Sequence, residues 1–184
     1  MIILASSSQR RIELLKDAGI KFEVIPSQVN EDMNKDLGPE NNAMNVALLK
    51  AEDVFQRHPN DLVVAADTIV VYNGKIFGKP LTEDKAIEML KTLAGKKHQV
   101  ITGVAILYKD KKEVFYSKTN VILKELSEQE IIDYVATKEP LDKAGAYAIQ
   151  GIGKSIVDTY EGDFFTIVGL PLKEVVDKIA KIQQ

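Results

Sequence analysis

Short apolar runs alternate with amphipathic stretches along the first third of this 184-residue chain. Ile2–Ala5 predicts a strand, and the segment that follows predicts a helix to about Ala18, with Gly19 as its stop. Phe22–Pro26 indicates a short strand, and residues 27–38 a polar loop. Pro39 suits the first turn of a second helix, whose apolar stripe at 3.6-residue spacing comprises Met44, Ala47, Leu48, Ala51, Val54 and Phe55.

The remaining pattern predicts hairpins interleaved with helices. Leu62–Tyr72 is followed by Asn73-Gly74, a strong two-residue turn signal, so Lys75–Phe77 is expected to return antiparallel. Thr82 and Gly95 then mark the start and end of a third helix, and two strands follow over Gln99–Tyr108 and Glu113–Lys124, joined by the turn Lys109–Lys112. A capping box at Ser127 predicts a fourth helix. The last predictions are a hairpin of Ser155–Thr159 with Phe164–Val168 and a final helix that begins at Pro171. This order favours an α/β fold with a mixed sheet covered by helices.

Composition limits the possible classes of function. The net charge of −3 argues against a broad nucleic-acid surface, although a local basic pocket remains compatible with it. The absence of cysteine and the presence of only two histidines disfavour a structural zinc site, so any metal would be a hard cation held by oxygen atoms. No apolar run approaches the roughly 20 residues of a spanning helix, and a first strand at Ile2 leaves no room for a signal peptide. We therefore expect a cytoplasmic protein with no membrane partner, formed by one domain over residues 1–184 with two joined lobes.

The segment Ser6-Ser7-Ser8-Gln9-Arg10-Arg11 lies where the first strand turns into the first helix. Serine hydroxyls, the unpaired N–H groups of a helix start and two guanidinium groups meet there, which is typical of a polyphosphate site. The alternative is that Ser8 only caps the helix while both arginines are solvated.

Asp67 interrupts the apolar run Leu62–Val71, where an ionised carboxylate has to be paired, metal-bound or at a sheet edge. Glu31 and Asp32 lie in the polar loop and would assist a phosphate-bound cation only if that loop folds over the phosphate site. Lys50 lies off the edge of the apolar stripe, where a lysine can simply cover core surface. Lys79 is held between Gly78 and Pro80 in a tight segment.

Residues 142–151 form a small, glycine-flanked segment that permits close approach of a ligand to the backbone. Gln150 offers one acceptor and two donors, enough to recognise the edge of a nucleobase, although a polar turn residue is the simpler interpretation. His58 and His98 are interpreted as ordinary loop or strand-edge residues.

Several motifs in order resemble one family. They are Ser6–Arg11, Ala65-Ala66-Asp67-Thr68, Gly78-Lys79-Pro80, Ile101-Thr102-Gly103-Val104, residues 139–147, Gln150-Gly151 and Val168-Gly169-Leu170-Pro171-Leu172. Together they are similar to the Maf family of nucleoside triphosphate pyrophosphatases, over essentially the whole chain. The resemblance implies a fold like that of inosine triphosphate pyrophosphatase, with two α/β lobes on a curved mixed sheet and the site in the cleft between them.

The resemblance also implies an activity: hydrolysis of a nucleoside triphosphate, dTTP or UTP in this branch, to the monophosphate and pyrophosphate with Mg²⁺ or Mn²⁺. Asp67 matches the catalytic proton acceptor, and Arg10, Thr68 and Gln150 match specificity positions. Ser6, Arg11, Glu31, Lys50 and Lys79 match positions around the phosphates and the metal, with Ser8 expected to help hold phosphate and Glu31 and Asp67 to hold the cation. A homodimer is an expected assembly.

Two other functions compete with this one. A non-catalytic nucleotide-binding regulator of cell division would use the same phosphate site without turnover, but the combination of Asp67, Glu31 and Lys50 argues against a pure sensor. A nucleic-acid-processing enzyme is disfavoured by the acidic balance and by the lack of a basic, aromatic stripe.

Overall fold

A computed structural model describes all residues, 1–184, and contains seven strands in one sheet. The strands are β1 (Ile2–Leu4), β2 (Glu23–Val24), β3 (Leu62–Tyr72), β4 (Lys75–Phe77), β5 (Lys97–Tyr108), β6 (Lys111–Leu123) and β7 (Val157–Glu161). Their order is β2-β1-β3-β5-β6-β7, with β4 paired to β3. β1 is parallel to β2 and β3, whereas the β3–β4 and β6–β7 pairs are antiparallel. The predicted mixed sheet is therefore confirmed.

The helices are α1 (Gln9–Asp17), α2 (Pro39–Arg57), α3 (Glu83–Leu93), α4 (Glu128–Ala136), α5 (Phe164–Val168) and α6 (Leu172–Ile182), with 3₁₀ helices η1 (Glu139–Asp142), η2 (Ala144–Ala146) and η3 (Gly151–Ile156). The sequence signals at their starts are confirmed for α1, α3 and α4, where the hydroxyls of Ser8, Thr82 and Ser127 accept from backbone N–H groups. The Asn73-Gly74 hairpin is confirmed by the pairing of Val71 with Ile76.

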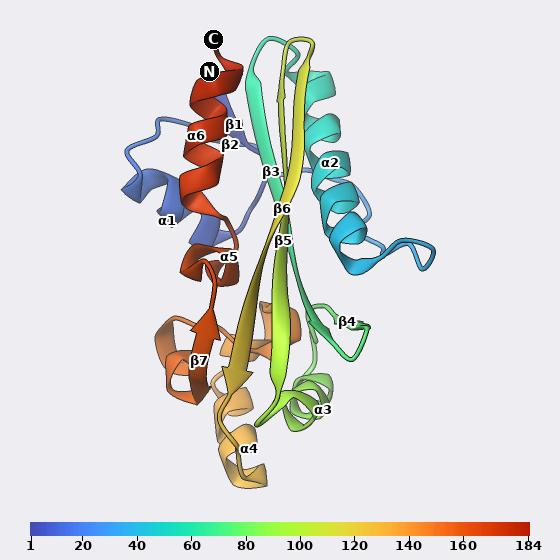
Figure 1. The fold of residues 1–184 in the computed structure, drawn as a ribbon, viewed down its shortest axis with the longest axis vertical. Helices are drawn as coiled ribbons and strands as arrows, with labels where there is room; N and C mark the ends of the chain where they lie inside the picture. Colours follow the sequence, from blue (N-terminus) through green and yellow to red (C-terminus); the bar gives the residue numbers. More distant parts are fainter. The chain divides into compact units, whose positions relative to one another are not determined.

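The chain divides into two compact units. The first comprises residues 1–68, 102–117 and 169–184, and the second comprises residues 69–101 and 118–168. In the first unit, Figure 1 shows α2 along one side of the strands and α6 along the other. Both faces of the central strands are covered, because Val63 and its neighbour Val64 both have 0% exposure.

The core beneath α2 follows from the two-residue period of a strand. Alternate residues of β1, β3 and β5 point to α2, and with its buried side chains they form a cluster of Ile3, Ala5, Ala47, Ala51, Val54, Val63, Ala65, Ala105 and Leu107. The predicted apolar stripe of α2 is confirmed for Ala47, Ala51 and Val54, which are buried in this cluster, and for Leu48 and Phe55, which are partly buried against it, while Met44 is half-buried. Ala43, Val46 and Lys50 are also buried and widen this face.

The predicted hairpin of Ser155–Thr159 with Phe164–Val168 is wrong. Val157–Glu161 forms β7 but pairs with β6, and Phe164–Val168 is the helix α5. Asp163 explains the difference, because its carboxylate accepts from the Phe165 N–H at 3.3 Å and from the Thr166 hydroxyl at 3.0 Å. Such a side chain satisfies the free N–H groups of a helix start, so the apolar run begins a helix here.

Candidate functional site

The Ser6–Arg11 segment is a capped helix start in the first unit. The Ser8 hydroxyl accepts from the Arg11 N–H at 3.5 Å, and the Ser8 N–H donates to the Ser6 hydroxyl at 3.1 Å. The cap that the sequence predicts is therefore confirmed, and Arg10 beside it is half-buried. Phosphate binding by Ser6, Ser8 and Arg10 stays a prediction.

Arg11 is buried, contrary to the alternative in which it is solvated. Its Nε donates to the Gly169 carbonyl at 2.7 Å, Nη2 to Thr68 Oγ1 at 3.0 Å and Nη1 to Ser6 Oγ at 3.5 Å. Burial lowers the pKa of Arg11 to about 10, with the Asp67 charge acting in the opposite direction, so the guanidinium stays charged near neutral pH. Arg11 thus joins three segments of the first unit, and its role as a phosphate ligand stays a prediction.

Strand alternation separates Asp67 from Thr68. Asp67 lies on the same face of β3 as Val63 and Ala65, the face that α2 covers. Thr68 lies on the opposite face, where its hydroxyl accepts from Arg11 and is 2.8 Å from the hydroxyl of Thr102. One strand therefore presents a carboxylate on one side and a hydroxyl on the other.

Lys50 bridges the two predicted carboxylates. It shares the buried face of α2 with Ala47, Ala51 and Val54, and its ammonium group lies 2.9 Å from Glu31 Oε1 and 3.4 Å from Asp67 Oδ1. It also donates to the Ala66 carbonyl at 3.2 Å. Lys50 is therefore a buried ion-pair partner and not a lysine that only covers core surface.

The carboxylate of Asp67 lies in an unfavourable environment for charge. Burial raises its pKa above the ordinary value, and the charges of Lys50 and Arg11 oppose that rise. Oδ1 contacts Lys50, whereas Oδ2 is buried without a hydrogen-bond partner. An orphaned buried oxygen of this kind is expected to receive a proton donor or a cation during function.

The residues present fit a hard divalent cation. No group of three or more His, Cys, Asp or Glu side chains forms a metal cage. Mg²⁺, however, is commonly held by one or two carboxylates together with water and substrate phosphates. Half-exposed Glu31 and the unpartnered Oδ2 of Asp67 supply that donor set, so the predicted cation remains compatible with this structure.

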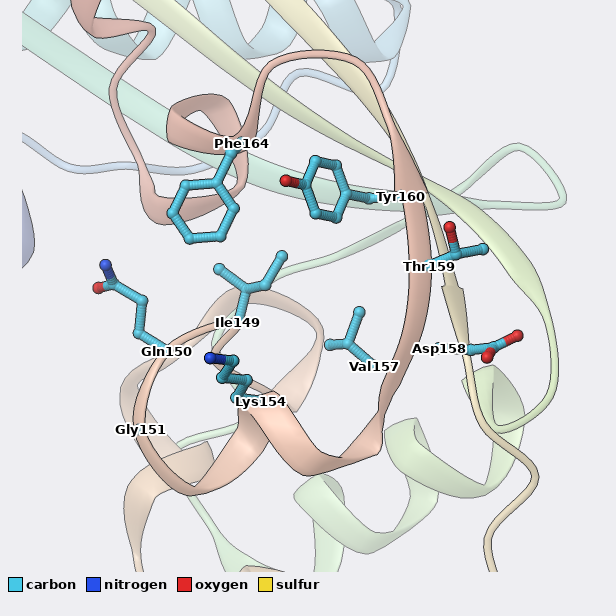
Figure 2. A pocket seen from close by; sticks show the side chains of 9 residues that line it. All are labelled: Ile149, Gln150, Gly151, Lys154, Val157, Asp158, Thr159, Tyr160 and Phe164. Carbon is cyan, nitrogen blue, oxygen red and sulfur yellow. The ribbon is translucent and has the colours of Figure 1, made fainter.

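Lys79 and Gln150 lie in the second unit. Lys79 is exposed next to the β3–β4 hairpin. Gln150 lines a pocket of about 680 Å³ together with Ile149, Gly151, Lys154, Val157, Asp158, Thr159, Tyr160 and Phe164. Figure 2 shows its amide at one edge of this pocket, with the rings of Tyr160 and Phe164 at another. The two aromatic ring centroids are 5.7 Å apart.

His98 lies near the start of β5, in line with its interpretation as a strand-edge residue. His98 is buried in β5, and its Nε2 lies 2.6 Å from the Tyr147 hydroxyl. Its Nδ1 faces the Lys96 carbonyl at 3.3 Å, which requires the proton on Nδ1 and makes Nε2 the acceptor. Burial lowers the pKa of His98 to about 4 and raises that of Tyr147, so both are neutral at physiological pH.

Sequence reasoning also missed the roles of Thr102 and Gly169. Thr102 is fully buried beside Thr68, and the carbonyl of Gly169 receives the shortest hydrogen bond of Arg11. A polar residue within the apolar run Val100–Leu107 was the available signal for Thr102. No local pattern could reveal that a carbonyl 158 residues away faces Arg11.

No helix has the length and apolar character needed to cross a membrane. The sequence model for the family described as Maf-like protein matches residues 1–182. A Caldicellulosiruptor saccharolyticus protein named dTTP/UTP pyrophosphatase is 48% identical over 187 residues, covering 98% of this chain and 94% of the relative. A Bacillus cereus (strain AH820) protein of the same name is 49% identical over 178 residues, covering 97% and 93%. The structure of the Staphylococcus aureus Ham1 protein superposes with a TM-score of 0.52 at 16% identity and covers 100% of this chain and 99% of that one, a likeness of fold alone.

Proposed function

The chain belongs to the Maf family, and we propose that it hydrolyses nucleoside triphosphates, above all dTTP and UTP, to the monophosphate and pyrophosphate. Relatives that carry the name dTTP/UTP pyrophosphatase match it at 48–50% identity over nearly their full lengths. The observation that carries the proposal is the buried Asp67 carboxylate, which has one oxygen against Lys50 and the other unpartnered.

Asp67 acts as the general base in this proposal. It takes a proton from a water molecule whose oxygen attacks the α-phosphorus, while the bond from that phosphorus to the bridging oxygen of pyrophosphate breaks. The proton then passes to solvent. The ammonium group of Lys50, 3.4 Å from Oδ1, favours the ionised carboxylate that this step requires. The ionised carboxylate of Asp67 is the acceptor for the water proton.

The positive groups compensate the charge of the triphosphate. Arg10 and Lys79 are the candidates for direct phosphate contacts. Arg11, which follows Arg10 at the start of α1, is buried and stabilises this helix start through its hydrogen bond to the Gly169 carbonyl. Glu31 and Asp67 would hold Mg²⁺ or Mn²⁺, which when bound neutralises phosphate charge and polarises the reacting phosphoryl group. Thr68 lies next to Asp67 in β3 and is the candidate for a further substrate contact.

Gln150 is proposed to recognise the base. Uracil and thymine present an N3–H donor beside a carbonyl acceptor, so a glutamine amide can accept from the first and donate to the second. Cytosine lacks that N3–H and would leave buried polar groups mismatched, at a cost of about 1–3 kcal/mol each. The pocket beside Gln150 offers apolar and aromatic walls from Ile149, Tyr160 and Phe164, which suit a planar ring.

The test is pyrophosphate release from a panel of nucleoside triphosphates with Mg²⁺. We expect release from dTTP and UTP, a large loss with CTP, and no turnover after chelation of the cation until Mg²⁺ or Mn²⁺ is restored. Asp67→Asn should lower kcat about 10²- to 10⁴-fold while nucleotide binding survives. Near-normal turnover of that variant would refute the role of Asp67.

Nucleotide binding by the wild-type protein without any product would instead favour the regulatory alternative. The homodimer and the cytoplasmic location expected from the sequence stay predictions. Size-exclusion chromatography with light scattering would decide the first of these two.

A further inference from the structure

Gln150 lies on a segment of the second unit that has no strand or α-helix to hold it. It directly precedes the 3₁₀ helix η3, and its side chain is exposed at the pocket edge. No hydrogen bond of its own side chain fixes its direction. The position of its amide therefore depends on what holds the backbone from Ala148 to Gly153.

The carboxylate of Glu139 holds that backbone on one side. Its Oε1 accepts from the Gly153 N–H at 2.8 Å, and its Oε2 accepts from the Ile152 N–H at 3.1 Å. These N–H groups belong to the first turn of η3 and have no partner within the helix. The carboxylate of Glu139, which is part of η1, therefore caps the start of η3. Both contacted residues, Ile152 and Gly153, lie within three residues of Gln150 in the sequence.

Tyr134 of α4 holds the segment on the other side of Gln150. Its hydroxyl donates to Glu139 Oε1 at 2.8 Å and accepts from the Ala148 N–H at 3.1 Å. Tyr134 is only 5% exposed, so its bond with Ala148 is shielded from competing water, and its bond with Glu139 is partly shielded. Glu139 and Tyr134 therefore form one connected clasp that grips the chain two residues before Gln150 and two and three residues after it.

The glycines on this segment match the close approach of the clasp. A Cβ atom at Gly153 would lie 2.1 Å from the Ala148 carbonyl oxygen and 2.5 Å from the Tyr134 hydroxyl oxygen. At Gly151 the φ angle is +66°, and a Cβ atom would lie 2.8 Å from Glu139 Oε2. Larger residues would push the backbone away from the clasp and move Gln150 with it.

We propose that Glu139, together with Tyr134, is a positioning residue for base specificity, which holds the backbone around Gln150 so that its amide lies at the pocket, where it distinguishes uracil and thymine from cytosine. This inference rests on the proposed function and adds to it the two side chains that hold the backbone around Gln150 in place before the substrate binds. Neither Glu139 nor Tyr134 is assigned contact with the substrate. Their effect on selectivity passes through Gln150.

The test is a double-mutant cycle of Glu139→Gln with Gln150→Ala, measured as kcat and KM for UTP and CTP. A glutamine at position 139 keeps the size of the side chain but replaces one acceptor oxygen by an NH₂ group, so one backbone N–H loses its partner. We expect KM for UTP to rise and the UTP/CTP ratio of kcat/KM to fall about tenfold, equivalent to about 1.4 kcal/mol. The kcat for UTP should change less than about twofold, because Asp67 and Lys50 lie in the first unit.

In the Gln150→Ala background, Glu139→Gln should leave the UTP/CTP ratio unchanged, since the residue through which it acts is gone. Tyr134→Phe, which removes a single oxygen atom, is the second variant and should lower the ratio in the same direction. Glu130→Gln is the matched control, because Glu130 also accepts a backbone N–H at a helix start, from Ser127, but at α4 and with no contact to this segment.

Independent, additive losses in the cycle would overturn the proposal, as would an unchanged ratio in both Glu139→Gln and Tyr134→Phe. If the wild-type protein hydrolyses UTP but Gln150→Ala alone leaves the ratio unchanged, the base-reading role of Gln150 fails and the positioning role fails with it. No release of pyrophosphate from any nucleotide would refute the proposed function itself. These outcomes are distinct, so each failure is attributable to one claim.

Discussion

The substitution Gly103→Ala tests how closely α2 packs on the sheet in the first unit. A Cβ atom at Gly103 would lie 2.3 Å from the carbonyl carbon of Ala43, 2.4 Å from its oxygen and 2.5 Å from the Met44 nitrogen. All three are backbone atoms, so no side-chain rotation can relieve the overlap. Ordinary contact begins at 3.4 Å, and α2 would therefore have to move about 1 Å away from β5.

The expected loss of stability follows from this displacement. Overpacking of a core commonly costs about 1–3 kcal/mol, and a clash with helix backbone is expected near the upper value, about 3 kcal/mol. For a chain of this length, 1 kcal/mol shifts Tm by about 2–4 °C, so Tm should fall by about 6–12 °C. Because Lys50 lies two turns beyond Ala43 on the same helix, its ammonium group should also shift relative to Asp67. A displacement of about 1 Å can cost up to about 10²-fold in rate.

The measurements are urea unfolding, thermal unfolding and pyrophosphate release from UTP. Gly78→Ala is the control, because a Cβ atom there meets nothing within 4 Å and the backbone is not in the left-handed region. Its free energy of unfolding should be unchanged or slightly higher. Equal unfolding free energies for Gly103→Ala and the wild type would refute the close approach of α2 to β5.

Two further predictions concern buried charge. Lys50→Met should lower the free energy of unfolding by about 3 kcal/mol, because it leaves Asp67 buried without its partner. In urea unfolding, adding Asp67→Asn to this variant should restore most of that loss. Additive losses in the double variant would contradict the pairing. The pKa of His98 is lowered from 6.5 to about 4 in the folded protein, so between these two pH values the unfolded chain binds a proton that the folded protein does not. The contribution of neutral His98 to the free energy of unfolding is therefore complete above pH 6.5 and is lost as the pH falls toward 4. Over that range, the free energy of unfolding of the wild type should therefore fall by about 3 kcal/mol more than that of His98→Gln. Parallel pH profiles of the unfolding free energy for the two proteins would exclude the effect.

Local signals of the sequence determined most of the secondary structure. Ser8, Thr82 and Ser127 cap helices in the structure as their hydroxyls predict, since a cap involves residues only three apart. The Asn73-Gly74 turn likewise needs no distant partner, because its backbone preference is intrinsic to the two residues. The helix at Phe164–Val168 was missed because a short apolar run suits either a strand or a helix, and Asp163 decides between them.

The motif residues of the candidate site were recognisable in the sequence, but their partners were decided by the tertiary structure. The isolated Asp67 in an apolar strand indicated a paired or functional carboxylate, whereas the identity of its partner required the register of α2 on β3, which places Lys50 opposite it. Arg11 was recognisable as a cation at a helix start, yet its bond to Gly169 joins residues 158 positions apart. The clasp of Glu139 and Tyr134 around Gln150 depends in the same way on α4, η1 and η3 coming together. Propensity and capping act over a few residues, whereas burial and hydrogen-bond partners depend on which distant segments the packed sheet brings together.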